Sequence, residues 1–171
     1  MLMNRRTARP AALAAGAVLL TSGLLAASAT AATAAPAKYS QAAAEKQLKR
    51  AGVTWVSSGR CSNRYNKRCT SFDQINKSTV AGVIDFKKAS KCAVTLTAGT
   101  EKGHASGPYS HWNGYKVDIK LTSCVNTYIT HKFRYVGERK GDRAKQYKSP
   151  AGNIYAREGS HWDVTYYRAA R

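Results

Sequence analysis

The chain has 171 residues, with 28 Lys and Arg against 9 Asp and Glu, and a formal net charge of +19 at neutral pH. This length suits one domain around one core, and the positive charge favours contact with polyanions. After residue 37 no segment approaches the ~18 consecutive apolar residues of a membrane span. The sequence therefore predicts no transmembrane segment in this part of the chain.

Residues 1–37 have the layout of a secretory signal peptide. They contain no acidic residue, begin with three arginines, continue through an apolar run rich in Ala and Leu, and end in small residues. Cleavage could follow Ala31, Ala35 or Ala37. We therefore expect a protein that is secreted and either extracellular or associated with a cell wall; the alternative is an Ala-rich disordered tail.

The remaining residues, 38–171, form one predicted domain that keeps 25 Lys and Arg against 9 acidic residues, a charge of +16. Outside a cell, such a surface could meet phosphate-bearing wall polymers, anionic lipid or shed nucleic acid. The alternative is that the charge only aids solubility. The basic residues are scattered rather than clustered, so no specific nucleic-acid partner is predicted, and we expect a monomer.

Hydrophobic periodicity and turn residues predict helices first and strands afterwards. Helices are expected over 39–50 and, capped by Ser78, over 78–89. Strands are expected over 53–56, 93–98, 115–121 and 133–136, followed by a hairpin of 153–157 with 161–167; segment 124–130 is ambiguous, and 59–70, 99–107 and 139–149 read as loops. The order predicts an α+β fold in which N-terminal helices pack on a small antiparallel sheet.

Four cysteines in a small exported domain favour two disulfides rather than a metal site, because no C-x-x-C pair is present. Three pairings are possible. We favour Cys61–Cys69, which closes a polar loop, together with Cys92–Cys124, which ties the start of one strand to the end of another.

One stretch, residues 107–121, combines a histidine and a carboxylate. Tyr115, Val117 and Ile119 alternate with polar residues, which is typical of a half-buried strand. Asp118 is therefore expected on the polar face of this strand, with His111 on the loop before it.

A second stretch, residues 157–164, repeats this design. His161 and Asp163 alternate there with apolar residues. If the two strands lie side by side, then His111, Asp118 and His161 can converge on one metal ion. Two imidazoles and a carboxylate are suitable ligands for Zn²⁺, which in hydrolytic sites keeps a fourth position for water and lowers its pKa to about 7. Glu158, three residues before His161, could act as the general base.

At these residues the sequence resembles the zinc D-Ala-D-Ala carboxypeptidases, D,D-dipeptidases and L-alanoyl-D-glutamate endopeptidases, which share the fold of the hedgehog signalling domain. Their pattern is S-x-H-x-x-G-x-A-x-D followed by E-x-x-H. His111, Gly114 and Asp118 match the first motif, and Glu158 with His161 matches the second. The resemblance implies that His111, Asp118 and His161 bind zinc and that Glu158 is the catalytic base.

The sequence departs from that pattern at three places. Tyr109 stands at the family's serine, with Ser110 one position late, and Lys116 stands at the family's alanine. The family's upstream substrate-orienting arginine has no clear counterpart, although Lys102, Arg60 or Arg64 could substitute. The residues expected to contact substrate around the site are Tyr109, Ser110, Trp112, Lys102 and His104.

The leading interpretation is a secreted zinc peptidase that hydrolyses peptide stems of bacterial cell wall next to a D-amino acid. Two alternatives remain open. One is an extracellular ribonuclease that uses His and Glu without metal. The other is a cationic wall- or membrane-binding protein without catalysis, in which the four site residues are ordinary loop and hairpin residues.

Overall fold

The computed structural model describes residues 35–167. The predicted signal peptide, residues 1–37, lies outside the described residues except for its last three positions. No helix within 35–167 combines the length and apolar character that crossing a membrane requires. The fold of these described residues is α+β, as predicted, with three helices, one seven-stranded sheet and one two-stranded sheet.

The helices are α1 (Gln41–Arg50), α2 (Lys77–Ser90) and α3 (Ser123–Lys132). Ser40 caps α1 by accepting a hydrogen bond from the Ala43 N–H, and Thr122 caps α3 in the same way through Val125. The predicted cap Ser78 is wrong: α2 begins one residue earlier, after Asn76. The ambiguous segment 124–130 is helical, so a helix interrupts the strands of the second half.

The strands are β1 (Lys38–Tyr39), β2 (Thr54–Trp55), β3 (Ile75–Asn76), β4 (Thr95–Ala98), β5 (Lys116–Lys120), β6 (Arg134–Glu138), β7 (Lys145–Lys148), β8 (Ile154–Arg157) and β9 (His161–Thr165). The large sheet has the order β2-β4-β5-β9-β8-β7-β6, and β1 pairs with β3 separately. The sheet is mixed, not antiparallel as predicted, because β2 pairs with β4 in parallel. Strand β7 also corrects the predicted loop 139–149.

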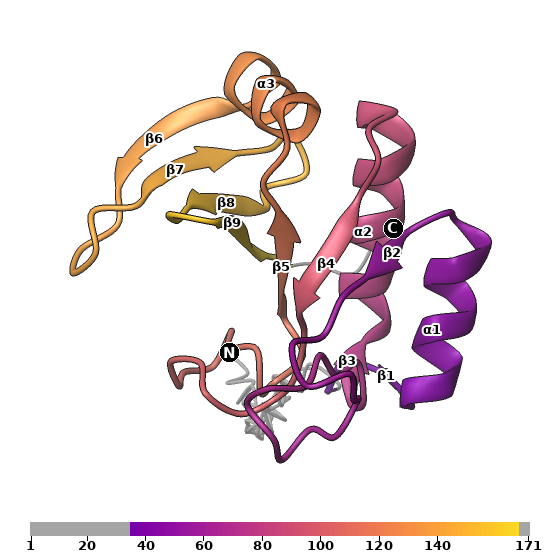
Figure 1. Cartoon of the computed structure of the whole chain (residues 1–171). Coiled ribbons are helices and arrows are strands. Elements are labelled where there is room, and N and C mark those ends of the chain that lie inside the picture. The colour runs from indigo at the N-terminus through magenta and orange to yellow at the C-terminus, as the bar shows by residue number, and fades with distance from the viewer. Residues whose placement is uncertain (1–34, 168–171) are drawn as a thin grey trace, which may run out of the picture. The chain divides into compact units, whose positions relative to one another are not determined.

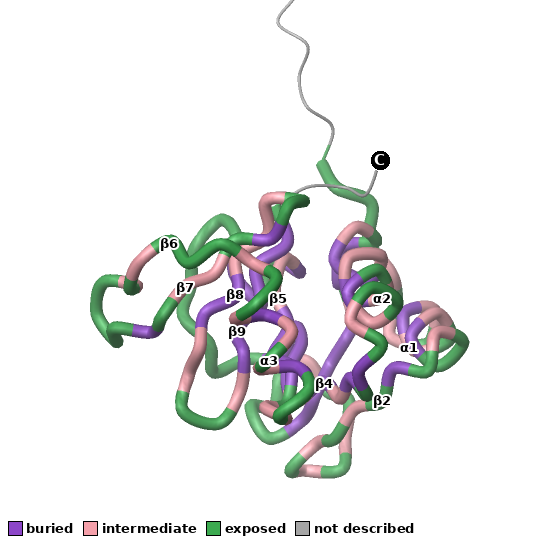
Figure 2. Tube along the Cα trace, turned by 90° about the horizontal axis from the view of Figure 1, so that it is seen from above, coloured by how far each residue is buried: buried purple, intermediate pink, exposed green. Residues whose placement is uncertain are grey.

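The core lies between the sheet and the helices. Figure 1 shows α1 and α2 on one side of β4 and β5, with α3 beside the start of β6. The central strands turn fully buried apolar side chains to the helical side, where they share one core with Val83 of α2. These residues are Val117, Ile119, Trp162 and Val164. Buried positions follow the central strands and the inner side of α2 in Figure 2. Because side chains alternate along a strand, the residues between these positions face the opposite side of the sheet.

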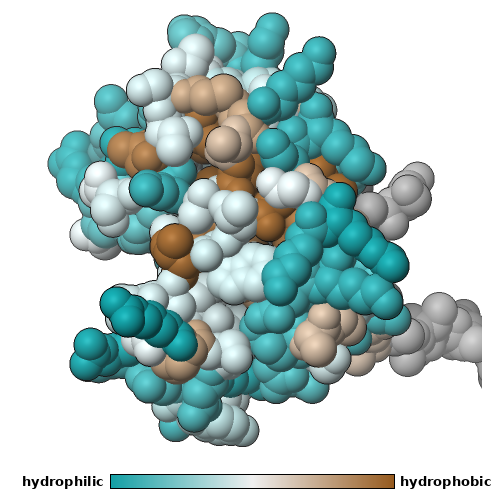
Figure 3. All heavy atoms as spheres, turned by 45° about the vertical axis from the view of Figure 1, so that its right-hand side comes forward, coloured by the Kyte–Doolittle hydropathy of each residue, from teal (hydrophilic) through white to brown (hydrophobic). Residues whose placement is uncertain are grey.

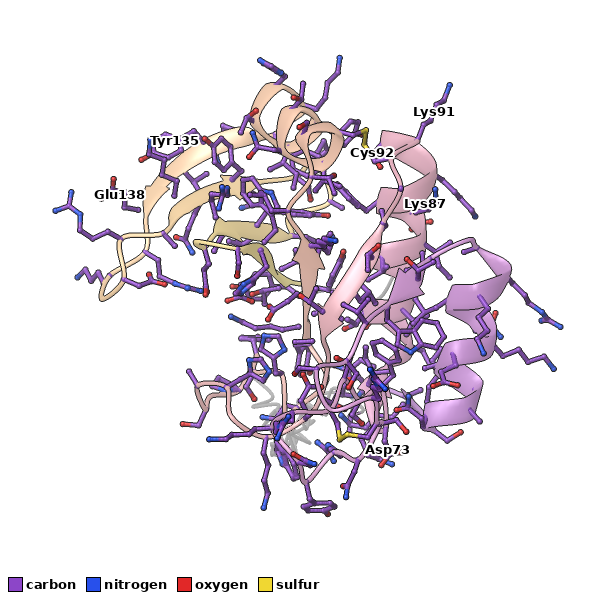
Figure 4. The ribbon with its side chains drawn as sticks, in the orientation of Figure 1. Asp73, Lys87, Lys91, Cys92, Tyr135 and Glu138 are labelled. Carbon is purple, nitrogen blue, oxygen red and sulfur yellow. A yellow bond between two sulfur atoms is a disulfide. The ribbon has the colours of Figure 1, made fainter. Side chains whose placement is uncertain are left out.

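Both predicted disulfides form, as Cys61–Cys69 and Cys92–Cys124. The first closes a short polar loop, and the second joins the end of α2 to α3. Figure 4 shows Cys92 at the end of α2, with Lys87 and Lys91 close by. Lys87 Nζ donates a hydrogen bond to the Cys92 carbonyl at 2.7 Å, which secures this turn.

Candidate metal centre

The site lies on the sheet face opposite α2 and is built on two neighbouring strands. Strands β5 and β9 pair antiparallel, so that Asp118 lies opposite Asp163 and Lys120 opposite His161. Cross-strand partners share a face, which brings two carboxylates and one imidazole together. The period-two pattern of both segments predicted this face correctly.

His111 reaches these carboxylates from the long connection between β4 and β5, which runs below the sheet in Figure 1. Its Nδ1 lies 2.7 Å from the Gly99 carbonyl, which can only accept a hydrogen bond, so Nδ1 carries the hydrogen. This bond fixes the ring and directs Nε2 toward Asp118 Oδ1 at 3.4 Å and Asp163 Oδ1 at 3.6 Å. A carbonyl behind an imidazole is a common arrangement for metal-binding histidines.

Asp118 lies between two imidazoles. Its Oδ1 faces His111, and its Oδ2 lies 3.4 Å from His161 Nε2. The Oε2 atom of Glu158 approaches the same His161 nitrogen at 3.2 Å. The structure thus brings together all four residues that the two motifs singled out, although 40 residues separate Asp118 from Glu158 in the sequence.

The distance of Asp118 from each of the two imidazoles suits a shared divalent cation. The separations of 3.4 Å exceed the usual length of a charged hydrogen bond, and ligands on a tetrahedral zinc ion are about 3.3 Å apart. Asp118 Oδ1 and Asp163 Oδ1 are buried and accept no hydrogen bond from any described residue. A buried carboxylate oxygen without a donor is costly, and a bound cation would remove that cost.

His104 is also close enough to serve as a ligand. Among the described residues, His104, His111 and Asp118 form a group whose ligand atoms all lie within 4.8 Å of one another, so this group could hold a metal ion. The His104 ring stacks on His111 with centroids 3.8 Å apart, and its Nε2 lies 3.3 Å from the buried Glu101. The sequence suggested His104 only as a substrate contact, and the structure brings it next to the predicted ligands.

Acidic surroundings determine the charge of His111. Burial disfavours the imidazolium, but the adjacent carboxylates of Asp118 and Asp163 outweigh burial and raise the pKa of His111 to about 9. Burial likewise opposes ionisation of Asp163, but His111 and Lys116 prevail and hold the pKa of that carboxyl well below its usual range. In the metal-free protein, His111 is therefore protonated near neutral pH, and its positive charge balances the carboxylates that a metal ion would otherwise balance.

Arg139 and Asp163 belong to the site, although neither was predicted. Arg139 extends from the β6–β7 hairpin and donates hydrogen bonds to Asp142, Glu158 and Asp163. Arg139 therefore links Glu158, the candidate base, to Asp163, the carboxylate beside His111. Asp163 could have been found, because it lies two residues after His161 on the same strand face. Nothing in the local sequence signals Arg139, whose position depends on the pairing of β6 with β7 and of β7 with β8.

Four of the five predicted substrate contacts line one cavity beside the site. A cavity of about 310 Å³ is lined by Lys102, His104, Ser110 and Trp112, among others. Tyr109 lies outside this lining and packs edge-on against Tyr115 and Tyr167.

Neither suggested arginine occupies this cavity. Arg64 stacks on the Trp112 ring at 3.7 Å and donates a hydrogen bond to the Trp112 carbonyl, so its role is to support the loop. Arg60 directly precedes Cys61, where the loop closed by the Cys61–Cys69 disulfide begins.

A larger cavity of about 690 Å³ lies on the helical side of the sheet, lined by residues that include Phe86, Tyr128 and Tyr155. It shares no residue with the metal centre. The candidate site is therefore identified by its converging donor atoms rather than by cavity size.

Comparisons with protein-family models, curated proteins and solved structures find no match to this chain. The resemblance of residues 107–121 and 157–164 to zinc peptidases stays a prediction from the sequence. Function must therefore be inferred from the geometry and chemistry of the site itself.

Proposed function

We propose that this protein is an exported, zinc-dependent peptidase that hydrolyses peptide bonds in the stems of bacterial cell-wall peptidoglycan, next to a D-amino acid. One observation carries the proposal: Asp118 lies between His111 and His161, and Glu158 lies 3.2 Å from His161. Two imidazoles, one carboxylate and one adjacent base are the groups that hydrolytic zinc sites use.

His111 and His161, through Nε2, and Asp118 would hold the zinc ion. Zinc with three protein ligands supplies a Lewis acid that polarises a carbonyl group and lowers the pKa of water to about 7. His104 and Asp163 border this ligand set, next to His111.

Glu158 would accept a proton from the attacking water and pass it to the leaving amine. Its side chain is 29% exposed, so solvent and substrate can reach it. Arg139 contacts its other oxygen, Oε1, and leaves Oε2 directed toward His161. A base held in one orientation needs less reorganisation during proton transfer.

The assignment to wall peptides rests on the motif resemblance and on composition. The cavity beside His104 can accommodate a short peptide branch, and Lys102 in its lining could pair with a carboxylate of the stem. The positive charge would keep the enzyme on an anionic wall. Figure 3 shows hydrophilic residues over the outer parts of one face, with neutral and hydrophobic residues through its middle.

The test compares the native protein with Glu158→Gln, and Glu138→Gln serves as the matched control. Glu138 lies on the nearby hairpin and pairs with Arg143 at 3.0 Å, away from the histidines. Zinc content and the release of peptide or D-alanine from purified wall are measured for all three proteins. We expect Glu158→Gln to keep zinc and lose turnover by about 10²- to 10⁴-fold, while Glu138→Gln behaves as native. Equal turnover in the native and Glu158→Gln proteins would contradict the proposal.

A further inference from the structure

A second feature of this chain is a positively charged hollow at the edge of the sheet formed by β6 and β7, next to the end of α3. The hollow has a volume of about 290 Å³ and is lined by Lys132, Arg134, Lys148, Ser149 and Pro150. We call it the cationic pocket. Three of its five lining residues are cations and none is an acid, so its lining favours an anion.

The fold places these charges together at a cost. Arg134 of β6 lies directly opposite Lys148 of β7, and like charges in this position destabilise a sheet. Among residues 35–167, none of Lys132, Arg134 and Lys148 forms an ion pair with an acidic residue. By contrast, Arg139 and Arg143 on the same hairpin are both paired. A bound anion would relieve the repulsion in the pocket.

Ser149 adds a hydrogen-bond donor to the pocket. It is buried, and its Oγ accepts a hydrogen bond from the Asn153 N–H at 3.1 Å. Its own hydroxyl hydrogen has no acceptor among the described residues. Three cations and a hydroxyl donor around one hollow match the several acceptor oxygens of a phosphate group.

Strand register relates the pocket to the metal centre. One continuous row of cross-strand partners runs across the sheet from β6 to β5. It contains Arg134, Lys148, Ile154, Thr165 and Lys116. Asp163 and Asp118 lie on the same sheet face, each two residues along its strand from Thr165 and Lys116 of this row. Lys148 lies two strands away from Asp163 and two residues further along the strand direction. With standard strand spacings, the distance between their Cα atoms is about 12 Å. Tyr135, labelled in Figure 4, marks β6, where Arg134 is the preceding residue.

We propose that the cationic pocket binds a phosphate group of a phosphodiester-linked wall polymer, so that an anionic strand lies across the sheet face while an attached peptide reaches the metal centre. Naming a wall polymer rests on the proposed function. Anion binding by the pocket rests only on the charges and the register.

The experiment measures binding of a poly(glycerol phosphate) chain in the presence of a chelator, which removes any contribution from turnover. The test variant is Arg134→Gln with Lys148→Gln. The control is Lys46→Gln with Lys88→Gln, which removes the same charge from exposed positions of α1 and α2. We expect the test variant to lose at least about tenfold in affinity and the slope of log affinity against log salt to fall by about 1 to 2. The control should change less than about twofold.

Equal losses of polymer affinity in both double variants would contradict specific binding at the cationic pocket. They would show that binding depends only on the overall charge of the protein. A single variant, Lys132→Gln, provides an independent check and should reduce affinity in the same direction. Tighter binding of a single-stranded oligonucleotide with the same number of phosphates, again dependent on Arg134 and Lys148, would overturn the wall-polymer assignment. Native turnover on wall peptides together with unchanged polymer binding in the test variant would reject this inference alone. Polymer binding without any turnover would reject the proposed function alone.

Discussion

At the scale of single residues, the site depends on carboxylates that have too few hydrogen-bond donors. Asp118 and Asp163 each bury an oxygen that accepts no hydrogen bond from a described residue, and both oxygens face His111. The histidine can balance them only as a cation, or by sharing a metal ion with them. Protonation of His111 and metal binding therefore compete for the same position.

This competition predicts a pH dependence of the metal-free protein. The folded-state pKa of His111 is raised to about 9, above its ordinary value of 6.5. A raised pKa contributes stability that is complete below about pH 6.5 and is lost as the pH rises through about 9. With chelator present, we expect the free energy of unfolding to fall by about 3 kcal/mol or less across this range.

Urea denaturation at several pH values measures this loss, and His111→Gln should remove it. With zinc present the trend should reverse, because zinc needs the neutral imidazole and binds more tightly as the proton leaves. The same decline in native protein and His111→Gln would show that His111 is not responsible.

Arg139 gives a second prediction at the residue scale. It is the shared partner of Glu158 and Asp163, and only part of its side chain is exposed. Arg139→Gln should lower the free energy of unfolding by about 1 to 2 kcal/mol, because Asp142, Glu158 and Asp163 lose a charged donor, and should slow turnover by releasing Glu158.

The control for this prediction is Arg143→Gln on the same hairpin. Its side chain is 83% exposed, so loss of its pair with Glu138 should cost less than about 1 kcal/mol. Equal effects of the two substitutions on stability and turnover would contradict a role for Arg139 in the site.

At the scale of elements, the connection from β4 to β5 decides whether His111 reaches the sheet. Gly114 ends the turn that starts at His111, and its N–H donates to the His111 carbonyl at 2.8 Å. Its φ is +81°, and a Cβ there would lie 2.6 Å from the Gln74 carbonyl oxygen. Only glycine tolerates both the backbone angle and this close approach.

Gly114→Ala should therefore destabilise the protein by about 2 to 4 kcal/mol and weaken metal binding, because His111 would move with the turn. Gly137→Ala is the control: its φ is also positive, at +110°, but no atom lies within 4 Å of a Cβ placed there. Its cost should be about 1 kcal/mol, with metal binding unchanged. Thermal unfolding and zinc titration of both variants measure the difference. An equal loss of zinc affinity would refute a specific role for the turn.

Local sequence predicted the elements that carry the ligands better than those that surround them. Strands β5 and β9 show clear alternation, so the polar placement of Asp118 and His161 followed directly. Strand β7 was missed because Lys145, Gln146 and Lys148 obscure any apolar period. Since β7 brings the hairpin and Arg139 to the site, the residue that orients Glu158 was missed with it.

At the scale of the whole molecule, two disulfides join segments that the sheet does not. Cys61–Cys69 spans 8 residues, and Cys92–Cys124 spans 32. Spacing and compartment were enough to predict both bridges. The parallel pairing of β2 with β4 could not be predicted, because β2 has two residues and its position depends on how α1 packs in three dimensions.

Loop entropy predicts unequal contributions from the two bridges. Replacing Cys92 and Cys124 by serine should lower the free energy of unfolding by about 4 kcal/mol, against about 2.5 kcal/mol for Cys61 and Cys69. Urea denaturation of the two double variants compares them directly. A larger loss from the short bridge would show that local structure of the polar loop, rather than chain entropy, dominates its contribution.

The central claim is that His111, Asp118 and His161 hold one zinc ion. Anomalous diffraction at the zinc edge, from crystals grown with one equivalent of zinc, tests it most directly. We predict a single peak about 2.0 to 2.2 Å from Nε2 of both histidines and from one oxygen of Asp118. A peak bound by His104 in place of His161, or no peak beside Asp118, would contradict the claim.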